Sequence, residues 1–126
     1  MAELTVLFHE GGVRSAWYFV TTDGKNPVLD FIETHQQSRP KDIEKLRRTI
    51  KNICEYPRPS EEMFRHEGQG IYAIKAAQAR VYGFQDGRRF IMGHAVFKKQ
   101  DRARKEDLKK ADKIREEYKR RKETLT

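Results

Sequence analysis

The chain has 126 residues and a formal net charge of +8, with 37% hydrophobic, 10% aromatic and 37% charged residues. This length supports one modest hydrophobic core but not two, so we expect a single domain over residues 1–126. The aromatic content is too high for a disordered chain, and no apolar run approaches the 18 residues of a membrane span.

The first elements along the chain are two predicted strands. Residues 4–10 (LTVLFHE) and 15–22 (SAWYFVTT) are rich in apolar, β-branched and aromatic side chains and are separated by two glycines. Residues 1–14 are thus predicted to form an N-terminal strand in addition to the rest of the domain. Glu3 stands where a secretory signal would carry Lys or Arg, and the apolar run that follows is only about five residues long, so we expect a cytoplasmic protein.

Two helices are predicted next. Asn26 followed by Pro27 is typical of an N-cap and a first helical position, which indicates a short helix over residues 27–35. A second helix is predicted from Lys41 to a point before Pro57. Its apolar positions recur at helical spacing: Ile43, Leu46, Ile50 and Ile53.

Residues 61–70 are polar and are predicted to form a loop, after which three strands are expected to form an antiparallel meander. The sequence Asp86-Gly87 between two apolar runs is a strong signal for a hairpin. The last strand lacks strict alternation of apolar and polar residues, which predicts a central position with both faces covered. The three strands are residues 71–76, 79–85 and 89–97.

The C-terminal region is the most basic part of the chain. Residues 98–122 contain 13 Lys and Arg against 6 Asp and Glu. A helix is predicted over residues 105–121, and its single thin apolar stripe suggests that it is held loosely. Such a charge distribution is typical of proteins that bind nucleic acid, although a solvated helix or one that docks on an acidic partner has the same pattern.

The predicted fold class is α+β, with two N-terminal helices packed on an antiparallel sheet and a basic helix at the C-terminus. The order and spacing of the motifs in residues 15–121 resemble the RelE/ParE toxin superfamily, and most closely the HigB-like, phage-derived toxins of type II toxin–antitoxin systems. The residues that carry the resemblance are Gly70, Ile71, Tyr72, Lys75, Arg80, Tyr82, His94, Lys98 and Lys99.

Two features depart from the pattern of that family. Lys75 stands where the family usually has Arg, which keeps the charge but loses the planar guanidinium. The first dozen residues have no counterpart in the family.

The resemblance implies a RelE-like fold and a toxin that cuts messenger RNA on the ribosome. Its implied partner is an antitoxin protein encoded next to it, of the helix-turn-helix DNA-binding kind. Attack of a 2′-hydroxyl on the neighbouring phosphate needs a proton acceptor, a proton donor and cations, but no metal or other cofactor.

The resemblance implies the catalytic candidates, and the distribution of basic residues adds the candidates for RNA binding. The catalytic candidates are Lys75, Arg80, His94, Lys98 and Lys99. The candidates for RNA binding are Arg88, Arg89, Arg102, Arg104, Lys105, Lys109, Lys110 and Lys113. No metal ligands are expected. His94 and Lys98 are predicted to share one face of their strand and to form the acid–base pair.

Several alternatives remain open at this stage. His94 lies among apolar neighbours, so a buried and structurally satisfied histidine is an equal interpretation. The protein could also be a catalytically inactive RelE-fold module that binds nucleic acid or protein. Inhibition of a topoisomerase, as in the ParE branch, is favoured less because of the Lys-Lys end of the strand.

Overall fold

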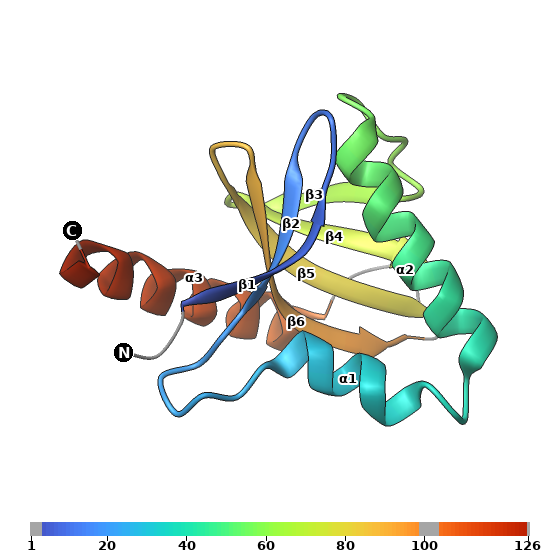
Figure 1. Cartoon of the computed structure of the whole chain (residues 1–126), viewed down its shortest axis with the longest axis horizontal. Coiled ribbons are helices and arrows are strands. Elements are labelled where there is room, and N and C mark those ends of the chain that lie inside the picture. The colour runs from blue at the N-terminus through green and yellow to red at the C-terminus, as the bar shows by residue number, and fades with distance from the viewer. Residues whose placement is uncertain (1–3, 99–103, 126) are drawn as a thin grey trace.

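A six-stranded sheet forms the centre of the protein in the computed structural model, which describes residues 4–98 and 104–125 (Figure 1). The strands are β1 (Thr5–Glu10), β2 (Ser15–Phe19), β3 (Phe64–Gly68), β4 (Ile71–Ala76), β5 (Ala79–Asp86) and β6 (Arg89–Phe97). Their order across the sheet is β1-β2-β6-β5-β4-β3. Neighbouring strands are antiparallel except for β2 and β6, which are parallel.

Three helices cover the two faces of this sheet. They are α1 (Pro27–His35), α2 (Pro40–Glu55) and α3 (Lys105–Leu125). Figure 1 shows α1 and α2 on one side of the sheet and α3 on the other. The protein is therefore α+β, as predicted, with the sheet as the middle of three layers.

Each face of the sheet carries its own hydrophobic core. On the side of α1 and α2, the fully buried residues include Ile32, Leu46 and Phe90. On the side of α3, Tyr82 and Ile91 of the sheet pack with Ala111 and Tyr118 of the helix; these members of the cluster are at most 2% exposed.

The two helices before the β3–β6 meander form for the local reasons that the sequence indicates. The side chain of Asn26 accepts a hydrogen bond from the backbone N–H of Leu29 at 3.2 Å, which caps α1. In α2, the four apolar residues predicted to face the core are all fully buried. Both helices thus confirm their predictions, apart from a start of α2 one residue earlier, at Pro40.

The central position predicted for the strand at residues 89–97 is confirmed. Strand β6 lies between β2 and β5. Phe90 and Met92 point into the core under α1 and α2, whereas Ile91 points into the core under α3. Both faces of β6 are therefore covered, which explains why its sequence does not alternate.

The predicted loop over residues 61–70 is wrong in part, because Phe64–Gly68 forms strand β3. This strand lies at the edge of the sheet and pairs only with β4. Its sequence, FRHEG, has a single apolar residue, Phe64, which is buried. An edge strand with one solvated side needs little apolar material, so periodicity alone does not reveal it.

The description of α1 and α2 as N-terminal helices is also wrong, because β1 and β2 precede them. The two strands form a hairpin that enters the sheet through β2, beside β6. After β2 the chain forms both helices and then strands β3, β4 and β5, and the last strand, β6, pairs with β2. The parallel pair makes the sheet mostly, not wholly, antiparallel.

The C-terminal helix is longer and better anchored than predicted. It continues to Leu125. Tyr118 is 2% exposed and donates a hydrogen bond to the carboxylate of Asp86 at 2.5 Å. Arg121 donates to the carbonyl of Val20 at 2.6 Å. Polar anchors of this kind supplement the thin apolar stripe, so the expectation of a loosely held helix is not met. None of the helices in the described part of the chain is long and apolar enough to cross a membrane.

Candidate functional site

Four of the predicted catalytic residues lie on the face of the sheet that α3 covers. Lys75 of β4 is directly opposite Arg80 of β5, and Tyr82 of β5 is directly opposite His94 of β6. Side chains of directly opposite residues project from the same face of an antiparallel pair. Tyr82 belongs to the core under α3, and residues two apart along a strand share a face. Lys75, Arg80 and His94 therefore all point to the side of α3.

Asp107, in the first turn of α3, joins two of the predicted residues. Its carboxylate oxygens lie 2.9 Å from Nε2 of His94 and 2.8 Å from Nζ of Lys98. The side chains of His94, Asp107 and Lys98 are 14%, 10% and 3% exposed. We call these three residues the His94–Asp107–Lys98 cluster. The prediction that His94 and Lys98 share a face is confirmed, since both contact the same carboxylate.

The charge state of Asp107 follows from its two partners. Burial raises the pKa of the carboxyl group. Hydrogen bonds from Lys98 and His94, together with the charges of these two residues, lower the pKa by more than burial raises it. The net pKa lies below its ordinary value, so Asp107 is ionised at neutral pH. A carboxylate only accepts hydrogen bonds, so the contact with His94 requires a proton on Nε2. In the neutral ring, Nδ1 is then the nitrogen that can accept a proton.

The ring of Tyr82 lies against two members of this cluster, His94 and Lys98. It stacks on the His94 ring with 5.9 Å between the centroids, and Nζ of Lys98 lies 5.6 Å from its centre. Burial raises the pKa of Tyr82, and the negative charges of Asp107 and Glu67 raise it further. The phenol therefore stays protonated and neutral, and Tyr82 serves as an aromatic surface rather than as a base.

Arg80 is more buried than a side chain that only binds phosphate would be. It is 7% exposed, and its Nη1 donates to the carbonyls of Ala77 and Ala79 at 2.7 and 2.9 Å. The guanidinium thus holds the β4–β5 turn. Its opposite neighbour, Lys75, is partly exposed.

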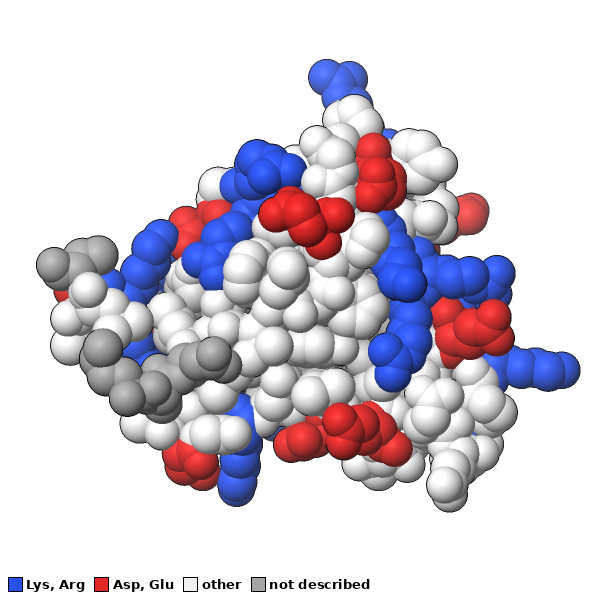
Figure 2. All heavy atoms as spheres, in the orientation of Figure 1, with Lys and Arg blue, Asp and Glu red and all other residues white. Residues whose placement is uncertain are grey.

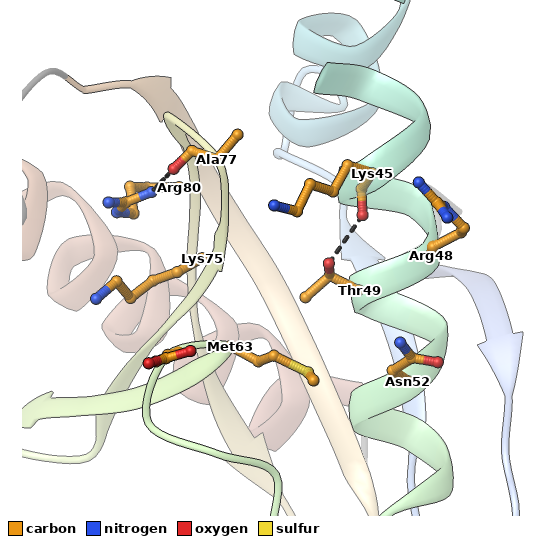
Figure 3. A pocket seen from close by; sticks show the side chains of 9 residues that line it. Lys45, Arg48, Thr49, Asn52, Met63, Lys75, Ala77 and Arg80 are labelled. Atoms are coloured by element: carbon orange, nitrogen blue, oxygen red, sulfur yellow. Dashed lines mark hydrogen bonds between the residues drawn. The ribbon is translucent and has the colours of Figure 1, made fainter. Parts of the chain in front are cut away.

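Lys75 and Arg80 also line a cavity of about 540 Å³ that reaches from the end of the β4–β5 hairpin to α2. Lys45 and Arg48 of α2 line it from the other side. Figure 3 shows Lys45 extending toward the hairpin, while the side chains of Lys75 and Arg80 point away from α2. Neither α2 residue was among the predicted site residues, although their spacing of three positions places them on one face of the helix.

Two residues predicted to bind RNA, Arg88 and Arg89, lie away from this site. Arg89 begins β6 and Arg88 directly precedes it, nine and ten positions before Lys98, which at about 3.4 Å per residue is the opposite end of the strand. Arg88 donates to the carbonyls of Val13 and Gly11. Arg89 stacks on Trp17 at 4.2 Å. Both residues fix the β1–β2 hairpin against the sheet, and the structure does not bring them to the cluster.

The other predicted RNA-binding residues divide by position. The exposed ones on or next to the N-terminal half of α3 are Arg104, Lys105, Lys109, Lys110 and Lys113. Along the chain they begin three residues before Asp107 and end six residues after it. Lys99 and Arg102 lie outside the described residues.

The remaining histidines have structural contacts of their own. His9 lies 3.2 Å from the carboxylate of Glu55, and His35 packs against Phe31 and Phe97. His66 accepts a hydrogen bond from the backbone of Gly70. In residues 4–98 and 104–125, no three His, Cys, Asp or Glu side chains come together as a metal would require.

Comparison with known proteins adds no relative. No protein-family model matches the chain, and a search of curated proteins finds no match.

Proposed function

We propose that this protein is the toxin of a type II toxin–antitoxin pair, an endoribonuclease that cuts messenger RNA on the ribosome without a metal. The observation that carries the proposal is the His94–Asp107–Lys98 cluster, which joins a histidine and a lysine on the face of the sheet that also bears Lys75 and Arg80. The resemblance of residues 15–121 to HigB-like toxins supports the choice of messenger RNA as substrate.

The proposed reaction uses the 2′-hydroxyl of the RNA as the nucleophile. His94 accepts the 2′-proton on Nδ1 while the 2′-oxygen attacks the adjacent phosphorus. The bond from phosphorus to the 5′-oxygen breaks, and Lys98 supplies a proton to that oxygen. The products are a 2′,3′-cyclic phosphate and a 5′-hydroxyl. Lys75 and Arg80 offset the extra negative charge on the phosphorane.

Induced expression followed by primer-extension mapping of cellular messages tests this proposal. We expect growth arrest and new message ends, and we expect rescue by co-expression of the neighbouring antitoxin gene. His94→Gln and Lys98→Gln should each abolish cleavage. Lys51→Gln is the matched control, because Lys51 is exposed on α2 and its replacement removes the same charge. In a ribosome-free assay, loss of cleavage on addition of EDTA would contradict the metal-independent mechanism.

One observation favours a second candidate function, a catalytically inactive RelE-fold module that binds nucleic acid or protein. The side chain of Lys98 is 3% exposed and that of His94 is 14% exposed, and Asp107 holds both. Residues so enclosed also suit a purely structural role. RNA binding without any new message ends, and without growth arrest at equal expression, would favour this second function.

A further inference from the structure

Helix α2 carries a polar stripe along an open cavity, with Lys45, Arg48 and Asn52 exposed and Thr49 buried. Lys45, Arg48, Thr49 and Asn52 are spaced at i, i+3, i+4 and i+7, which places them along one side of the helix. All four line the cavity of about 540 Å³ at the end of the β4–β5 hairpin. Figure 3 shows Lys45 and Thr49 on the side of α2 that faces the hairpin. We call this cavity the α2 groove.

The α2 groove has an excess of positive charge. Four of its nine described lining residues are cationic, and Glu62 is the one carboxylate among them. Within the described residues, neither Lys45 nor Arg48 forms an ion pair or a side-chain hydrogen bond. Arg39, at the N-cap of α2, by contrast lies 2.7 Å from the carboxylate of Asp42. Figure 2 shows several basic side chains over α2, with acidic side chains between them. The groove is therefore suited to an anion.

The polar character of the groove favours a nucleic acid over a protein partner. Among the lining residues that the structure describes, only Met63 and Ala77 are apolar. Protein interfaces usually depend on a central apolar patch with aromatic anchors. Single-stranded nucleic acid binds instead along positively charged grooves that follow its phosphates. Thr49 and Asn52 add neutral hydrogen-bonding groups beside the cations.

We propose that the α2 groove holds backbone phosphates of the same RNA strand that is cut at the His94–Asp107–Lys98 cluster. The proposal rests on the proposed function and extends it, because Lys75 and Arg80 belong both to the catalytic face and to the lining of the groove. The strand passes over the end of the β4–β5 hairpin, from the catalytic face to α2. Lys45 and Arg48 are binding residues and do not touch the reacting atoms.

Binding of a short 2′-O-methyl RNA oligonucleotide, which lacks the free 2′-hydroxyl and cannot be cut, tests the groove independently of catalysis. The groove variant is Lys45→Gln with Arg48→Gln. The matched control is Arg47→Gln with Lys51→Gln, which removes the same two charge types from another side of α2. Dissociation constants are measured for the wild type and both variants over a range of salt concentrations, with thermal midpoints as a check on folding.

The groove variant should bind more weakly at low salt than the control. Its slope of log affinity against log salt should fall by roughly 1.4, since each phosphate contact of a single strand contributes about 0.7. Equal slopes for the groove and control variants would overturn the inference. If the wild type still cuts messages in that case, the proposed function survives alone. Conversely, a groove that binds RNA in a protein that cuts nothing would overturn the proposed function, and with it the claim that the bound strand is the one that is cut.

Two other outcomes would also overturn the inference. The first is a wild type that does not bind the oligonucleotide at low salt. The second is a polyglutamate peptide of equal charge that binds more tightly than the RNA and loses its binding in the groove variant. That result would assign the α2 groove to an acidic protein segment.

Discussion

The substitution Asp107→Asn separates the chemical role of the His94–Asp107–Lys98 cluster from its structural role. An asparagine has the shape of aspartate, but it presents one oxygen that accepts and one NH₂ that donates. The carboxylate serves two donors at once, at 2.9 Å to His94 and 2.8 Å to Lys98. His94 and Lys98 contact different oxygens of the carboxylate, so in the variant one of them keeps an acceptor and the other meets the NH₂ group.

Lys98 should take the amide oxygen, because an ammonium group has no acceptor and cannot face an NH₂. The NH₂ of the introduced amide then faces Nε2 of His94, which must become the acceptor. The proton of the neutral ring therefore moves from Nε2 to Nδ1. In the proposed mechanism Nδ1 is the base, so cleavage should fall by at least the 10²-fold lower bound typical of general-base contributions, with little change in RNA affinity.

Stability should fall as well, by an amount that burial of the cluster allows us to estimate. Hydrogen bonds to charged groups contribute about 1.5–3 kcal/mol each, and one of two weakens in the variant. For a chain of this size that loss corresponds to a decrease in thermal midpoint on the order of 10 °C. Asp112→Asn is the control on the same helix. Asp112 pairs with Arg115 but its side chain is 43% exposed, so the substitution should cost less than about 1 kcal/mol.

The decisive measurement is the ¹⁵N chemical shift of the two ring nitrogens of His94, which reports the tautomer directly. A wild-type ring already protonated on Nδ1, or a tautomer unchanged by Asp107→Asn, would refute the assigned role of Asp107. Loss of stability alone, with cleavage and tautomer intact, would show that the cluster only anchors α3.

Three further predictions concern the surroundings of the site. Arg80→Ala should lower the free energy of unfolding by about 1–3 kcal/mol as well as abolish toxicity, because it leaves two backbone carbonyls of the β4–β5 turn without their donor; urea denaturation measures this, and an unchanged midpoint would contradict it. Gly93→Ala should destabilise by about 1–3 kcal/mol, since the new Cβ would lie 2.8 Å from Cγ2 of Ile114 on α3; wild-type stability would mean that α3 yields without cost. Hydrogen bonds from Lys122 and Tyr118 lower the pKa of Asp86, and the contacts with Lys98 and His94 outweigh burial and lower the pKa of Asp107. Both ionised carboxylates therefore stabilise the fold at pH values above the ordinary pKa of a carboxyl group. The thermal midpoint should accordingly be level near neutral pH and fall below about pH 4, as the pH passes through the lowered values; a midpoint that does not fall there would contradict the assigned contacts.

The sequence predicted the elements whose side chains repeat with a clear period. Helix α2 is the example, whereas strand β6 was recognised by a continuous apolar run, because burial on both faces removes the alternation. Strand β3 lacks such a pattern because it lies at the edge and buries only Phe64. Helix α3 also buries few apolar residues, so its apolar pattern is weak. Tyr118 and Arg121 nevertheless hold it through hydrogen bonds to residues that are distant in the sequence. Contacts of that kind have no local signature.

The site shows a similar division. The alternation of side chains along a strand is enough to place His94 and Lys98 on one face. The identity of their common partner could not be predicted, because Asp107 lies in a helix that the sequence presents as basic, and only the return of α3 across the sheet brings it back to β6. Charge type alone was equally insufficient for Arg88 and Arg89, which serve the β1–β2 hairpin at the far end of β6.

The position of Asp107 links the stability of the fold to the chemistry proposed for the site. Lys98 is almost completely buried, and a buried cation is tolerated only with a close anion or several hydrogen bonds. The same carboxylate orients His94 and fixes the first turn of α3 against β6. Any substitution in the cluster therefore changes folding and catalysis together, and activity alone cannot assign a role to these residues. The tautomer of His94 must therefore be read together with cleavage: any carboxylate at Nε2 selects the Nε2–H form, and only a tautomer change that is accompanied by loss of cleavage at unchanged RNA affinity identifies Nδ1 as the base.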